Sequence, residues 1–88
     1  MKKAHFVKGY IESTYCFSME EAKKEALQIV SRALDLANLG LIQREAHVYA
    51  HVYTTPDLFT PVATAVIDPV TGKPAFSDYS KLRKEVAA

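Results

Sequence analysis

The chain has 88 residues, of which 49% are hydrophobic and 24% are charged, and this composition predicts one globular domain spanning residues 1–88 rather than a disordered chain. Eleven basic residues oppose ten acidic ones, and the resulting net charge of +1 excludes a protein that relies mainly on a strongly basic surface. A single cysteine excludes an intramolecular disulfide framework and a zinc site built from several thiolates.

The sequence predicts a cytoplasmic protein that does not associate with membranes. No apolar run approaches the roughly 20 residues needed to cross a bilayer. Two lysines follow Met1, but Lys8 and Glu12 interrupt the apolar stretch that a secretory signal peptide requires. The lone thiol, Cys16, is in keeping with a reducing compartment.

Residues 4–16 predict a first β-strand, because polar and apolar side chains alternate along them. One predicted face carries Val7, Ile11 and Tyr15, and the other carries Lys8, Tyr10, Glu12 and Thr14. Gly9 is expected to mark a bulge or a close approach of a helix.

Residues 18–39 predict a long helix. Ser18 and Glu21 form the S-x-x-E capping box that begins a helix, and Gly40 suits the left-handed position that ends one. Apolar side chains recur at helical spacing and form one stripe: Ala22, Ala26, Ile29, Val30, Ala33 and Ala37.

Residues 43–55 predict a second strand with nearly perfect alternation. Its small apolar residues are expected to face the helix: Ala46, Val48, Ala50 and Val52. Its polar and aromatic residues are expected to share the opposite face: Glu45, His47, Tyr49, His51 and Tyr53.

The remaining segments predict a strand at 61–68, a turn at 68–73, a short fourth strand at 74–76 and a short helix at 79–87. Because short connections join the last strands, we expect antiparallel pairing. The predicted fold is α+β: a small antiparallel sheet of β-α-β-β order, extended by the short strand, with its helices packed on one face.

The polar and aromatic face of the second strand is the candidate functional surface. We predict that His47, Tyr49, His51 and Tyr53, together with Tyr10, bind a partner, because tyrosines offer large contact area with a polar tip. An ordinary solvated sheet surface explains the same residues. Histidines are also the side chains whose ordinary pKa lies near neutrality, so binding is expected to change between about pH 5.5 and 7.5.

A metal site and a catalytic cysteine are less consistent with the sequence. Histidines four residues apart in a strand are about 13 Å apart, so chelation would need His5 or Glu12 from elsewhere in the sheet. Cys16 precedes a helix N-terminus, where a thiolate can be stabilised, but a lone buried cysteine is usually a packing residue. We therefore expect no metal, no cofactor and no catalytic role for Cys16.

These observations lead to three hypotheses for function. The leading one is a small non-enzymatic protein-binding module, an accessory subunit or inhibitor, which also forms a homodimer. The alternative is a single-stranded RNA-binding protein that uses the same aromatic face, with Lys81, Arg83 and Lys84 contacting phosphates. The third is a small enzyme or metabolite binder with a site at a dimer interface, where His47 or His51 acts as the acid–base group.

Overall fold

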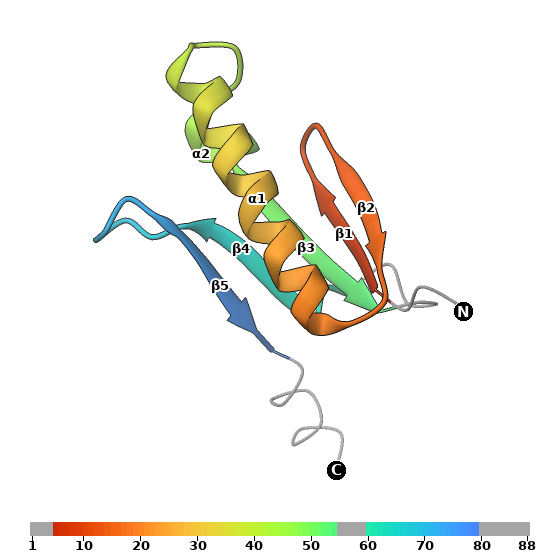
Figure 1. Cartoon of the computed structure of the whole chain (residues 1–88). Coiled ribbons are helices and arrows are strands. Elements are labelled where there is room, and N and C mark those ends of the chain that lie inside the picture. The colour runs from red at the N-terminus through yellow and green to blue at the C-terminus, as the bar shows by residue number, and fades with distance from the viewer. Residues whose placement is uncertain (1–4, 55–59, 80–88) are drawn as a thin grey trace.

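The computed structural model describes residues 5–54 and 60–79 (Figure 1). In these residues the elements are β1 (His5–Gly9), β2 (Ser13–Cys16), α1 (Met19–Asn38), α2 (Arg44–His47), β3 (Tyr49–Thr54), β4 (Ala63–Ile67) and β5 (Pro74–Asp78). The strands form one antiparallel sheet in the order β2-β1-β3-β4-β5. The long helix α1 packs on one face of this sheet, which confirms the predicted α+β class.

Both ends of α1 follow the sequence prediction. The Ser18 hydroxyl accepts a hydrogen bond from the Glu21 amide at 3.2 Å, while the Glu21 carboxylate accepts one from the Phe17 amide at 2.9 Å. At the other end Gly40 has a φ of 79°, and the amides of Gly40 and Leu41 donate to the carbonyls of Ala37 and Leu36, both at 3.0 Å. These paired bonds satisfy carbonyls that a helix end otherwise leaves without partners.

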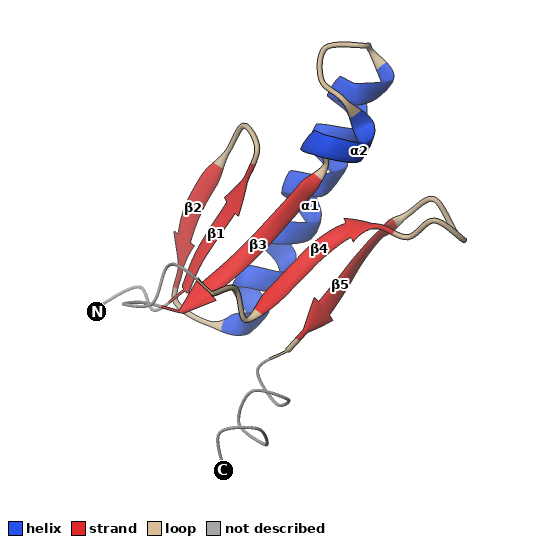
Figure 2. Ribbon diagram, turned by 180° about the vertical axis from the view of Figure 1, so that it is seen from behind, coloured by secondary structure: helices blue, strands red, loops and turns tan. Residues whose placement is uncertain are grey.

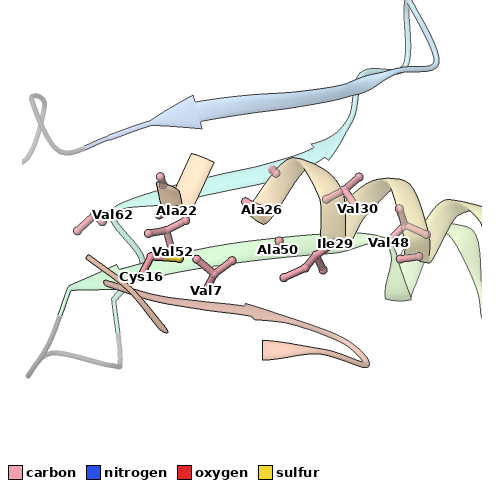
Figure 3. Packing of buried hydrophobic residues seen from close by; sticks show 13 residues of the cluster. Val7, Cys16, Ala22, Ala26, Ile29, Val30, Val48, Ala50, Val52 and Val62 are labelled. Carbon is pink, nitrogen blue, oxygen red and sulfur yellow. The ribbon is translucent and has the colours of Figure 1, made fainter. Parts of the chain in front are cut away.

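The core lies between α1 and the sheet (Figure 3). Small side chains dominate both surfaces, with Ala22 and Ala26 on the helix and Ala50, Ala63 and Ala65 on the strands. The largest fully buried side chains are Ile29, Val7, Val30 and Val52. Small residues on both surfaces let the helix and the sheet approach closely, since no long side chain separates them.

Gly9 shows how close this approach is. A Cβ atom at Gly9 would lie 2.5 Å from Cγ2 of Ile29 and 3.1 Å from the carbonyl oxygen of Tyr49. The prediction that a helix approaches Gly9 is therefore correct.

The single strand predicted at 4–16 is wrong, because these residues form the hairpin β1–β2. The Gly9 amide donates to the Glu12 carbonyl at 2.7 Å and closes the turn. The turn also changes which sequence positions face the helix: Val7 and Cys16 are buried, whereas Tyr15 is 47% exposed. Val7 and Tyr15 thus lie on opposite faces rather than on the same one.

The start of the strand predicted at 43–55 is also wrong. Residues Arg44–His47 form the single helical turn α2, and β3 begins at Tyr49. The Gln43 amide donates to Nδ1 of His47 at 2.9 Å, so the histidine side chain caps this turn. Ala46 is consequently exposed instead of facing the core, whereas Val48, Ala50 and Val52 are buried as predicted.

The second hairpin, β4–β5, agrees with the sequence prediction. The predicted fourth strand is present and extends from Pro74 to Asp78. In the connecting turn the Asp68 carboxylate accepts a hydrogen bond from the Val70 amide at 2.8 Å, and Gly72 has a φ of 72°. The helix predicted at 79–87 lies outside the described residues except for Tyr79. Within the described ranges, no helix is long and apolar enough to span a membrane.

Candidate functional site

The candidate site is the face of the sheet that points away from α1, here called the open face. Successive side chains of a strand point to opposite sides, so the neighbours of the buried strand residues lie on this face. Strand alternation and the pairing register assign it the following residues: Phe6, Lys8, Ser13, Tyr15, Tyr49, His51, Tyr53, Thr64, Val66, Ala75 and Ser77. Figure 2 shows α1 behind the sheet, with no other described helix or strand over the open face.

Three rings form an aromatic row across β2, β1 and β3. Phe6 pairs with Tyr15 of β2 and with Tyr53 of β3. Its ring centroid lies 4.7 Å from that of Tyr15 and 6.4 Å from that of Tyr53. Each such ring pair contributes about 0.5–1.5 kcal/mol of stability beyond the burial of its apolar area. The row therefore presents a pre-ordered apolar surface although it lies outside the core.

His51 lies between two tyrosines on β3. Its ring centroid is 4.9 Å from that of Tyr49 and 6.4 Å from that of Tyr53. Its Nδ1 is 3.2 Å from the Thr64 hydroxyl on β4, and which atom donates depends on the imidazole tautomer. Partial burial lowers the pKa of His51, so the neutral imidazole predominates at neutral pH.

The structure separates the predicted site residues into two groups. Tyr49, His51 and Tyr53 share the open face, as their alternation predicted. His47 instead belongs to α2 and stacks on Tyr10, which follows β1, with 3.7 Å between ring centroids. Glu45 is exposed on α2, so the predicted single row of five side chains in one strand is wrong.

The open face is sparsely charged. Among its described residues, Lys8 is the one permanent cation and none is a carboxylate. Lys8 pairs with His51 on β3, and His51 pairs with Thr64 on β4, so the polar groups form a band across the middle of the sheet. The arrangement suits an apolar contact that is bordered on one side by hydrogen-bonding groups.

Sequence reasoning missed Phe6 and Tyr15. Phe6 was not assigned to either face, and treating residues 4–16 as one strand placed Tyr15 on the same face as Val7. Val7 and Cys16 are separated by an odd number of positions, so they cannot both face one side of a continuous strand. Because both are apolar residues suited to the core, this spacing could have revealed a turn between them.

Cys16 lies on the covered face, with 3% of its surface exposed. It pairs with His5 across the hairpin, a neighbour that the sequence spacing did not reveal. The buried Nδ1 atom of His5 has no hydrogen-bond partner among the residues that the structure describes. Among the described residues, no group of three or more histidine, cysteine, aspartate or glutamate side chains is placed to hold a metal ion.

Cavities also occur where the edges of the sheet meet the helices and the β4–β5 turn. One of about 300 Å³ lies between β2 and α1 and is lined by Thr14, Tyr15, Cys16, Glu21, Lys24 and Glu25. Another of about 370 Å³ lies beside α2 and the β4–β5 turn, where Arg44 and Asp68 contribute to its lining. His51 lines neither of them, so these cavities offer no pocket in which its imidazole would act on a small molecule.

Comparison of the chain with protein-family models, with curated proteins and with solved structures gave no match.

Proposed function

We propose that this protein is a small non-enzymatic binding module whose open face binds a protein partner. The observation that carries the proposal is the placement of the aromatic residues. None of the described phenylalanine or tyrosine side chains is fully buried, while Phe6, Tyr15, Tyr49 and Tyr53 gather on the open face. Folding alone favours aromatic side chains in the core, where they bury the most apolar area.

The chemistry of the open face fits a protein interface. Interfaces concentrate tyrosine and phenylalanine at their centre and deplete charged groups there. The aromatic row supplies such an apolar cluster, and Lys8, Ser13 and Ser77 supply polar groups in the row beside it. A module of this kind acts by occupying or presenting a surface, and this supports a role as an accessory subunit or an inhibitor.

Single-stranded RNA binding is a second candidate. Rings on the adjacent strands β1 and β3 can stack bases, and no described residue of the open face carries a carboxylate that would repel phosphates. However, affinity for nucleic acid depends on several cations, and Lys8 is the one permanent cation among these residues. This shortage favours the protein partner.

The decisive variant is Tyr49→Ala combined with Tyr53→Ala. A protein captured by the wild-type chain would be purified and titrated calorimetrically against both forms. The double variant should lose about 2 kcal/mol or more of binding free energy, because both rings lie on the open face. A control variant, Val70→Ala, alters a side chain that is 89% exposed in the β4–β5 turn and should bind like the wild type.

A parallel titration with a short single-stranded RNA separates the two candidates. RNA binding that falls steeply with salt, and that is lost when Lys81, Arg83 and Lys84 are changed together to alanine, would favour the RNA-binding function. Unchanged binding of every partner by the Tyr49 and Tyr53 double variant would refute the proposal that the open face is the functional surface.

A further inference from the structure

Strand β2 forms one edge of the sheet, and no described strand pairs with its outer side (Figure 1). Natural edge strands are commonly protected by a proline or by charged side chains. The four residues of β2, Ser13–Cys16, include neither. The opposite edge, β5, begins with Pro74, which has no amide hydrogen to donate, and ends with the charged Asp78. Of the two edges, β2 is therefore the one suited to pairing with a further strand.

The β1–β2 turn fixes which backbone groups of β2 point outward. Along antiparallel strands, hydrogen-bonded pairs of residues alternate with non-hydrogen-bonded pairs. The Gly9 amide donates to the Glu12 carbonyl at 2.7 Å, so these two residues form a hydrogen-bonded pair. The pairs that contain Ser13 and Tyr15 are consequently of the other kind. The amide and carbonyl groups of both residues therefore point away from β1, toward the outer side of β2.

A groove lies between this edge and α1. Its cavity of about 300 Å³ has room for one long side chain and is at the lower limit of pockets that hold small molecules. Thr14 and Cys16 contribute to its lining from β2, and Glu21, Lys24 and Glu25 line it from α1. Two carboxylates and one ammonium group give the lining a net negative charge. The groove therefore favours a basic side chain over an acidic one.

An ion pair restrains β2 relative to α1. At the turn end of β2, Oε2 of Glu12 lies 2.7 Å from Nε of Arg32, and Oε1 lies 2.8 Å from Nη2. A bidentate pair of this kind fixes the orientation of both side chains. The edge and the groove therefore keep their relative positions without a bound partner.

We infer that β2 binds an extended segment of a partner protein, which adds to the sheet as an antiparallel strand and places a lysine or arginine side chain in the groove. The outward amides and carbonyls of Ser13 and Tyr15 offer up to about four hydrogen bonds to such a segment. The partner residue opposite Thr14 then points into the groove, because directly paired residues share a face. The site uses the edge of the sheet rather than the open face, so it does not depend on the proposed function.

The test uses a display library of random peptides of about seven residues, the length of a strand. Peptides selected on the full chain would be titrated calorimetrically. They should carry a lysine or arginine between strand-forming residues and bind with dissociation constants of roughly 10 µM to 1 mM, because β2 offers only four residues for pairing. Changing the basic residue to glutamate should weaken binding at least about tenfold. A library that yields no binding peptide, or peptides without a basic residue, would overturn the inference.

Two variants at Ser13 identify the edge. Ser13→Pro removes an outward amide hydrogen but none of the bonds between β1 and β2, and it should weaken peptide binding at least about tenfold. Ser13→Ala keeps the amide and should bind peptides like the wild type. Circular dichroism would verify that both variants fold. Equal peptide binding by the two folded variants would overturn the inference.

A variant of the groove tests the inference independently of the proline. Glu25→Gln removes a carboxylate from the lining and should reduce the preference for the lysine peptide over its glutamate counterpart at least about threefold. Glu20→Gln changes an exposed carboxylate in the first turn of α1 that does not line the groove, and it serves as the control. Equal preferences in the two variants would contradict a basic side chain in the groove.

Further outcomes separate this site from other occupants and from the open face. If peptide binding is lost in the Tyr49 and Tyr53 double variant but retained in Ser13→Pro, the peptides bind the open face, and the inference fails while the proposed function stands. If sedimentation shows a wild-type dimer that Ser13→Pro dissociates, a second copy occupies the edge and the inference also fails. Loss of peptide binding in Ser13→Pro, with retention in the double variant, would establish the edge of β2 as a separate site.

Discussion

The two faces of the one sheet differ in side-chain size more than in hydrophobicity. The covered face carries alanine and valine, and all of the fully buried strand residues belong to it. The open face carries the aromatic row and the His51 group, which remain partly exposed. Small side chains bring α1 close to the central strands, and Ile67 and Phe76 pack at the edge of the core on the covered face. The remaining large side chains, those of the aromatic row and Tyr49, lie where no described helix or strand covers them. The covered face therefore supplies the core, whereas no described helix or strand packs on the open face.

The sharpest way to break this comparison is to remove one large side chain of α1 that packs on the covered face and one large side chain of the open face. Ile29→Ala should lower the free energy of unfolding by about 3 kcal/mol, because it leaves a cavity between the helix and the sheet. Tyr15→Ser, on the open face, should lower it by less than about 1 kcal/mol, because the tyrosine is already 47% exposed. Urea denaturation of both variants makes the measurement. Equal losses would show that both faces contribute similarly to folding.

A second prediction concerns how closely α1 packs on the covered face. Gly9→Ala should lower the free energy of unfolding by about 2 kcal/mol, since the new methyl group meets Ile29 and the Tyr49 carbonyl oxygen. In an Ile29→Ala background the same change should be less destabilising, because one of the two clashes is gone. A double-mutant cycle measured by urea denaturation gives this coupling. Strict additivity would contradict the close approach.

The covered face was largely predictable from the sequence. Helical spacing identified the stripe of α1 that faces the sheet, and strand alternation identified Val48, Ala50 and Val52. These patterns are local consequences of burying one side of a regular element. The α+β class followed from them.

The open face was only partly predictable. Tyr49, His51 and Tyr53 follow from alternation within one strand, but the aromatic row depends on pairing between strands that are distant in sequence. Tyr10 and Ile11 are residues that favour strands, and they concealed the β1–β2 turn. Helix-favouring residues at 44–46, by contrast, could have indicated α2.

A third and smaller effect is expected at Cys16, which lies at the edge of the covered face. Cys16→Ser should lower the free energy of unfolding by about 1–2 kcal/mol, because the hydroxyl is more costly to bury than the thiol. Binding of a partner to the open face should be unchanged. In the folded wild-type chain the thiol should react slowly with a labelling reagent at neutral pH, as its 3% exposure implies. Rapid labelling would instead indicate an accessible, reactive thiolate.

The smallest predicted effect links the open face to pH. The pKa of His51 is lower in the folded chain than in the unfolded chain, where it lies near its ordinary value of 6.5, because partial burial disfavours the charged imidazole. As the pH falls through 6.5, the unfolded chain binds a proton first, so the free energy of unfolding should decrease. His51→Gln removes this contribution and leaves His5 and His47 unchanged in the sequence. Urea denaturation of the wild type and the variant at pH 7.5 and about pH 5.5, in dilute solution, would measure the difference. The wild type should lose more stability than the variant on acidification, and equal losses would show that His51 is not buried enough to respond to folding.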